Sequence, residues 1–159
     1  MAESQVFSFP YQQEISGVLG KSLRPRLPVQ VKGKRGNWVT ISLYLDTGAD
    51  ISILPKSSAD ILGIPLRSGS EVIVVGLAGE LIRAYIHELE CKLGDFEPLS
   101  AKFAISEKET VVPVLGREGF FQRFNFKFNN QNQTVEVEKL RNHKPPFWVN
   151  STAVDNAIA

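Results

Sequence analysis

The sequence predicts an all-β fold, built as either a barrel or a sandwich. Segments in which apolar and polar residues alternate recur along most of the chain, and a period of two is typical of strands with one buried face. Turn segments rich in Gly, Asn or Pro separate them at short, regular spacing. The 159 residues are 43% hydrophobic, which is sufficient for one hydrophobic core.

The regular pattern begins with a predicted β-hairpin. Residues 27–32 (LPVQVK) and 38–45 (WVTISLYL) both alternate, and the Gly-containing segment 33–37 (GKRGN) lies between them. Two strands about a short turn of this kind form a hairpin. Apolar residues resume at 51–55 after a break.

A short helix is predicted near residues 57–62, ended by Gly63 and Pro65. The segment 118–124 (EGFFQRF) predicts one or two further helical turns. Strands are predicted at 71–75, 80–93 and 100–106, a buried strand at 111–116, and a closing hairpin from 125–130 and 134–140.

Three regions follow from this pattern. Residues 1–23 form an N-terminal arm, predicted to be irregular or clamped because its first 20 residues keep no sustained period. Residues 24–140 form the domain. Residues 141–159 form a C-terminal tail that includes Pro145-Pro146 and is predicted to be disordered or to dock through Phe147 and Trp148.

The composition excludes several classes of protein. With 18 Lys+Arg against 17 Asp+Glu, the net charge of +1 argues against a nucleic-acid or membrane partner held by bulk electrostatics. One cysteine, Cys91, and two histidines exclude a disulfide framework and a Cys- or His-based metal cluster. The chain shows neither a transmembrane run nor a secretory signal, so a cytoplasmic location is expected.

The segment that carries chemistry is Asp46-Thr47-Gly48. It places a carboxylate directly after a predicted buried strand, where Gly48 permits a tight turn that brings a backbone N–H toward the carboxylate. Taken alone, the triplet is also an ordinary turn sequence, because Asp and Gly are common in turns. Its neighbours decide between these two interpretations.

Three segments in order resemble the retropepsin-like, or retroviral-type, aspartic proteases, in a non-viral, bacterial-looking form. They are residues 43–52 (LYLDTGADIS), 74–80 (VVGLAGE) and 111–118 (VVPVLGRE), with Gly116 seventy positions after Asp46. The resemblance spans residues 24–140. It implies a closed acid-protease barrel with a short C-terminal helix and one lobe per chain.

The resemblance also implies a function. Such enzymes need two carboxylates sharing one proton, and this chain has a single Asp-Thr-Gly. An aspartic endopeptidase of this length is therefore expected to be a homodimer with both Asp46 carboxylates on the two-fold axis, acting on polypeptides without metal or cofactor. In the family, Thr47, Gly48 and Ala49 support the site.

The family also pairs the Asp of the loop with the Arg of the later segment, which here predicts an ion pair between Asp50 and Arg117. If the pair is partly buried, removing one partner is expected to cost several kcal/mol.

The predicted flap comprises Val75, Gly76, Leu77, Ala78 and Gly79. It departs from retroviral flaps, which often carry glycines on both sides of the tip, and Glu80 adds a charge beside it. This departure leaves a second hypothesis open, in which the chain is an inactive, protease-like module that binds or scaffolds peptides.

Overall fold

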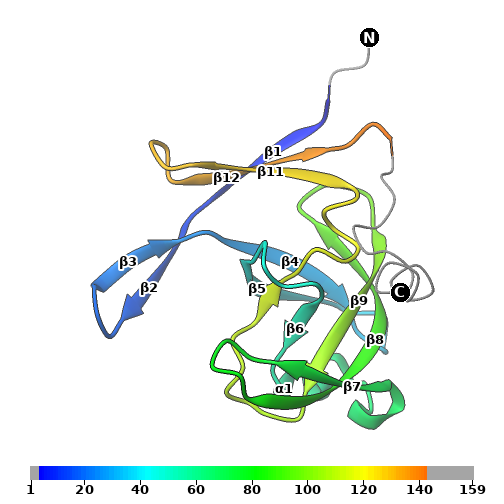
Figure 1. Ribbon diagram of the computed structural model, residues 1–159. Helices are drawn as coiled ribbons and strands as arrows, with labels where there is room; N and C mark the ends of the chain where they lie inside the picture. Colours follow the sequence, from blue (N-terminus) through cyan, green and yellow to red (C-terminus); the bar gives the residue numbers. More distant parts are fainter. Residues whose placement is uncertain (1–3, 143–159) are drawn as a thin grey trace, which may run out of the picture.

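Six strands close into a barrel. Hydrogen-bonded neighbours follow the order β4, β5, β10, β6, β9 and β8, and pairing of β4 with β8 closes the ring (Figure 1). Strand β7 extends the sheet beyond β8. The all-β prediction is confirmed, and of the two architectures that the residues left open the protein has the barrel. This computed structural model describes residues 4–142.

The elements follow the predicted order closely from β4 onward. The barrel strands and β7 are β4 (Arg26–Lys32), β5 (Trp38–Leu45), β6 (Ser52–Leu54), β7 (Ser70–Val75), β8 (Leu81–Leu93), β9 (Leu99–Ser106) and β10 (Val114–Leu115). The others are β1 (Val6–Pro10), β2 (Gln12–Ser16), β3 (Gly20–Arg24), β11 (Phe124–Asn129), β12 (Thr134–Lys139), helix α1 (Ser57–Leu62) and the 3₁₀ turn η1 (Leu66–Ser68).

The barrel core comes from the alternation read in the sequence. Leu27, Val29 and Val31 of β4 all point inward and are fully buried. They belong to one hydrophobic cluster with Leu43 of β5 and Phe103 of β9. Because a shift of one residue would turn every one of these side chains outward, this core also sets the register of the β4–β5 pair.

Strand β10 is one of the six strands of the barrel wall and is shorter than predicted. It pairs in parallel with β5 and antiparallel with β6. The expected strand over 111–116 is reduced to Val114–Leu115 because Pro113 has no N–H to donate to a ladder. The Pro113 carbonyl still accepts a hydrogen bond from Tyr44 N, at 3.0 Å.

The N-terminal arm is more regular than predicted. Strand β1 pairs antiparallel with β12, which pairs on its other side with β11, and these three form a separate sheet. Phe7 of β1 packs edge-on against Phe96, with ring centroids 4.6 Å apart. Two alternating aromatics in residues 6–10 were too short a pattern to be recognised as a strand, and only pairing with β12 makes it one.

The predicted closing hairpin, β11 and β12, is confirmed, and so is the helix α1, which ends at Gly63. No helix within residues 4–142 is long and apolar enough to cross a bilayer. The predicted docking of the tail through Phe147 and Trp148 lies outside the described residues.

The helix expected after Gly116 is replaced by two successive turns over residues 117–123. Hydrogen bonds from Phe121 N to Arg117 O and from Phe124 N to Phe120 O close these turns. Gly119 has a φ of +80°, which a right-handed helix does not contain. The part of the chain from residue 117 to 142 therefore has no α-helix.

Substituting Glu109 with Gln is expected to lower the thermal midpoint near neutral pH but not in acid. Hydrogen bonds from the Ser57 hydroxyl and backbone N–H, at 2.6 and 2.8 Å, hold the pKa of Glu109 below its usual 4.5. A carboxyl whose pKa is lowered on folding stabilises the fold above its unfolded-state pKa. That contribution is lost as the pH falls through the folded-state pKa.

The measurement compares thermal midpoints of the wild type and Glu109→Gln from about pH 7 down to about pH 3. Glu97→Gln is the matched control, because that side chain is 89% exposed and its salt-bridge partner, Lys139, lies 3.8 Å away. A difference for Glu109→Gln that persists unchanged into acid would contradict the expectation.

Candidate active site

Asp46 follows directly on strand β5. The strand is held in the ring on both sides, by β4 and β10, and Leu43 two residues from its end is fully buried. The backbone N–H of Asp46 donates to Leu115 O at 3.1 Å. The carboxylate is thus carried by the end of a barrel strand, which is a more rigid support than a free loop.

The loop after Asp46 turns back on its carboxylate. Gly48 N donates to Asp46 Oδ1 at 2.9 Å, and Ala49 N to Asp46 O at 3.4 Å. Asp46 is half-buried, whereas Thr47 and Gly48 are exposed. The predicted approach of a backbone N–H to the carboxylate is present, and one carboxylate oxygen is oriented by it.

The segment 113–118 runs beside this loop and is bonded to it. Arg117 N donates to Ala49 O and Glu118 N to Asp50 O, both at 2.9 Å. The sequence interpretation missed a third connection, in which Gly116 N donates to the hydroxyl of the buried Ser52 at 3.0 Å. Ser52 stands six residues after Asp46 in the same motif, but its role depends on a contact with the residue that follows the neighbouring strand, β10, 64 positions further along the chain.

Gly116 lies against the backbone of the other loop. A Cβ built at this position would lie 2.4 Å from Ile51 C and 2.5 Å from Ile51 O. These are backbone atoms of the loop that carries Asp46, so they cannot move aside as a flexible side chain would. The absence of a side chain at Gly116 is what allows the two segments to pack together.

The predicted ion pair is present, with Arg117 Nη2 2.9 Å from Asp50 Oδ1. The Asp50 side chain is 86% exposed and that of Arg117 35%. The pair therefore links the two segments at the surface, and the several kcal/mol expected for a partly buried pair do not apply in the single chain.

Substituting Asp50 with Asn is expected to lower the free energy of unfolding by less than about 1 kcal/mol, because exposed ion pairs are screened by water. Urea unfolding of Asp50→Asn, Arg117→Gln and the double variant measures the coupling energy between the two side chains. A coupling energy of several kcal/mol would contradict this expectation.

Behind the loop, Tyr44 of β5 is tied to the N-terminal arm. Its phenol donates to the Glu14 carboxylate, and the Arg26 guanidinium stacks 4.7 Å above its ring. Burial and the Glu14 hydrogen bond raise the pKa of Tyr44, so its phenol remains a donor. The strand that ends at Asp46 is thereby connected to residues far upstream.

The predicted flap is the turn between β7 and β8. Gly76 N donates to Glu80 O and Gly79 N to Gly76 O, both at 2.9 Å. The Glu80 carboxylate folds over Gly76 and accepts from Ala78 N at 3.2 Å. The charge beside the turn thus bonds to the turn's own backbone, while Val75, Leu77 and Leu81 remain exposed.

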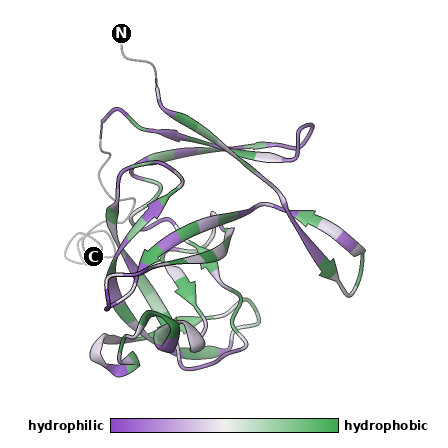
Figure 2. Ribbon diagram, turned by 180° about the vertical axis from the view of Figure 1, so that it is seen from behind, coloured by the Kyte–Doolittle hydropathy of each residue, from purple (hydrophilic) through white to green (hydrophobic). Residues whose placement is uncertain are grey.

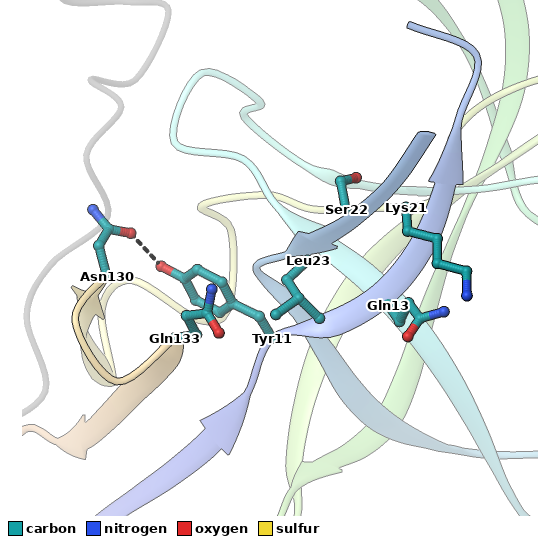
Figure 3. A pocket seen from close by; sticks show the side chains of 7 residues that line it. All are labelled: Tyr11, Gln13, Lys21, Ser22, Leu23, Asn130 and Gln133. Carbon is teal, nitrogen blue, oxygen red and sulfur yellow. Dashed lines mark hydrogen bonds between the residues drawn. The ribbon is translucent and has the colours of Figure 1, made fainter. Parts of the chain in front are cut away.

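A cavity of about 550 Å³ lies elsewhere, between the β2–β3 hairpin and the β11–β12 turn. Figure 3 shows Tyr11 reaching across it to Asn130, with a hydrogen bond of 2.8 Å between them. None of its lining residues belongs to the Asp46, flap or Arg117 segments. Around the half-buried Asp46, Thr47 and Gly48 are exposed in the single chain.

The sequence model of a protein family, described as aspartyl protease, matches residues 27–118. This stretch runs from β4 to the end of the 113–118 segment and includes Asp46, the predicted flap and Arg117. No curated protein sequence matches the chain.

Among solved structures, a retropepsin-like aspartic protease from Rickettsia conorii superposes with a TM-score of 0.50 at 16% identity, over 87% of this chain and 97% of that one. The retroviral protease-like domain of Ddi1 from Leishmania major gives 0.49 at 15%, over 79% and 98%. EIAV protease, complexed with an inhibitor, gives 0.46 at 21%, over 59% and 82%. The Rickettsia structure confirms the fold that the three motifs implied.

Proposed function

The chain belongs to the aspartyl protease family, and from this premise we propose that it is a homodimeric aspartic endopeptidase. The catalytic pair consists of Asp46 from each of two subunits. The observation that carries the proposal is the half-buried Asp46 carboxylate, oriented by Gly48 N at the end of a barrel strand.

The chemistry requires both carboxylates. Two of them a few ångströms apart share one proton, because like charges at that distance do not both ionise. The ionised Asp46 takes a proton from a water held between the pair, and that water attacks the scissile carbonyl. The protonated Asp46 donates to the carbonyl oxygen as negative charge develops there.

A second copy supplies the second carboxylate. The chain has one Asp-Thr-Gly, and the Thr47 and Gly48 that follow Asp46 are exposed. The Thr47 hydroxyl has no hydrogen-bond partner within residues 4–142, which agrees with a bond to the other subunit. Isologous contact about a two-fold axis would bring the two loops together.

Residues around Asp46 act as positioning groups. Gly48 orients the carboxylate, while Ala49 and Asp50 bond through their carbonyls to the backbone of Arg117 and Glu118. These bonds hold the Asp46 loop on the 113–118 segment. Pre-organisation of this kind keeps the carboxylate where the partner's carboxylate and the water need it.

The substrate is a polypeptide in an extended conformation. The exposed Val75, Leu77 and Leu81 are an apolar surface that would be covered when the turn between β7 and β8 closes over a bound chain. Such closure excludes water from the reacting groups. We assign Val75, Gly76, Leu77, Ala78 and Gly79 to this flap.

The test is hydrolysis of a denatured protein by the purified chain over acidic to neutral pH, with Asp46→Asn assayed beside it. Cleavage by the wild type alone supports the proposal. Binding of the peptide without cleavage would favour the other candidate, an inactive peptide-binding module of the same fold.

A further inference from the structure

The N-terminal arm contains a hairpin whose strands pair with no other sheet. Strands β2 and β3 pair with each other only and form a separate two-stranded sheet, and the hairpin extends away from the barrel (Figure 1). We call residues 12–24 the arm hairpin. An isolated two-stranded hairpin is at best marginally stable in water, and the side-chain contacts of this one with the barrel are made by Gln12 and Glu14, near its base, and not by its tip.

The tip of the arm hairpin is apolar and exposed. Ile15, Val18 and Leu19 are 80%, 91% and 73% exposed, and Figure 2 shows hydrophobic residues gathered at this end. Exposed apolar side chains are common singly but seldom cluster at the tip of a projecting element. The tip therefore has the character of a contact surface.

The root of the arm hairpin lies beside the Asp46 loop. Pro25, the residue after β3, accepts a hydrogen bond through its carbonyl from Leu45 N at 3.4 Å, and Leu45 immediately precedes Asp46. Glu14 of β2 accepts from the Tyr44 phenol and lies 3.6 Å from Arg26 Nη1. The hairpin is thus fastened to the strand that carries the carboxylate.

We propose that the arm hairpin is a dimerisation arm whose tip packs on a second copy of this chain. The inference rests on the proposed function, because that function puts Asp46 on the two-fold axis. An element rooted one hydrogen bond away from Leu45 then starts at the interface. Since it extends away from its own barrel, the partner is what it reaches.

The size expected of a stable interface also favours a second copy of the chain as the partner of the arm tip. A stable interface buries about 800 Å² on each partner, which a contact made by Asp46, Thr47 and Gly48 alone does not supply. The arm tip adds three apolar side chains on each subunit. With a net charge of +1, two copies meet with little electrostatic repulsion.

The first experiment measures the solution mass of the full chain by sedimentation over a range of concentrations. In the triple variant Ile15→Ser, Val18→Ser, Leu19→Ser, the dimer dissociation constant is expected to rise at least about tenfold. The triple variant should lose peptidase activity on dilution and regain it at higher protein concentration. Ile61→Ser is the matched control, since Ile61 is an exposed apolar residue of α1.

Folding of the triple variant is checked by circular dichroism and thermal unfolding. The three side chains are largely exposed, so their loss removes little packing from the single chain. An unchanged dissociation constant in a folded triple variant would overturn the proposal.

The second experiment identifies what the tip touches. Val18→Cys introduces one accessible thiol, because Cys91 is fully buried and burial raises its pKa to about 12. A photoactivated cross-linker attached at position 18 is expected to produce a covalent dimer. A cross-link within one chain, as to residues 143–159, or no cross-link at concentrations where the protein is dimeric, would overturn the proposal.

The two levels of inference fail differently. If the wild type is a dimer that cleaves peptides but dimerises without the arm tip, only the proposal of a dimerisation arm is contradicted. If the wild type remains monomeric at every concentration, both the proposed dimeric enzyme and the proposed dimerisation arm are contradicted.

Discussion

Substitution of Asp46 with Asn is expected to reduce peptide-bond hydrolysis by about 10³-fold or more. The amide neither accepts the proton of the attacking water nor shares a proton with a partner. The fold should survive, because the amide oxygen of Asn still accepts the hydrogen bond that Gly48 N makes to Asp46 Oδ1. Cleavage of a denatured protein, followed over acidic to neutral pH, measures the loss.

The control is Asp95→Asn, which removes an exposed carboxylate in the turn between β8 and β9 and should retain wild-type activity. Thermal unfolding and solution mass of Asp46→Asn should match those of the wild type. Full activity in Asp46→Asn would show that this carboxylate does no chemistry.

Mixing the two proteins tests the shared site directly. When a large excess of Asp46→Asn chains is equilibrated with the wild type, most wild-type chains become paired with a variant subunit by mass action. Each such heterodimer has one Asp46 carboxylate in place of two and should be inactive. If each subunit carried a complete site, activity per wild-type chain would instead stay constant.

Substitution of Gly116 with Ala is expected to destabilise the protein by about 3 kcal/mol. The added methyl group would lie 2.4 Å from Ile51 C and 2.8 Å from Ser52 N. Relief requires the 113–118 segment to separate from the Asp46 loop, which breaks the hydrogen bond from Gly116 N to the Ser52 hydroxyl. Activity should fall together with stability, because the same loop carries the carboxylate.

Urea unfolding measures the change, and Gly17→Ala is the control. A Cβ at Gly17 would meet nothing within 4 Å, so this variant should unfold close to the wild type. A Gly116→Ala protein of wild-type stability would mean that the two segments are less closely packed than described.

The barrel could be read from the chain wherever a pattern was long enough. The alternation of residues 27–32 and 38–45 predicted β4 and β5, and Gly63 and Pro65 marked the end of the predicted helix α1. The strand β1 in the N-terminal arm was not predicted, because its pattern is too short. Strand β1 has two inward aromatics and becomes a strand only by pairing with β12, more than one hundred residues away.

The candidate site divides in the same way. Asp46, Gly48 and Asp50 were identified from one short motif and Arg117 from a second one 67 positions later, and the structure brings the two motifs to one place. Ser52 was missed because a serine in a motif carries no sign that its hydroxyl will meet Gly116 N. The exposure of the Asp50–Arg117 pair was also beyond local reasoning, since burial depends on everything packed around a residue.

The sequence was sufficient for the strand periods and for each of the three family motifs, because these are patterns of residues close together in the chain, and the count of one Asp-Thr-Gly needs no structure. The tertiary structure determined the features that the sequence patterns did not predict. It placed the 113–118 segment against the Asp46 loop, replaced the expected helix by turns at Gly119, and attached the arm hairpin to Tyr44 through Glu14. No periodicity in the sequence indicates these features, so they are seen only in the folded protein.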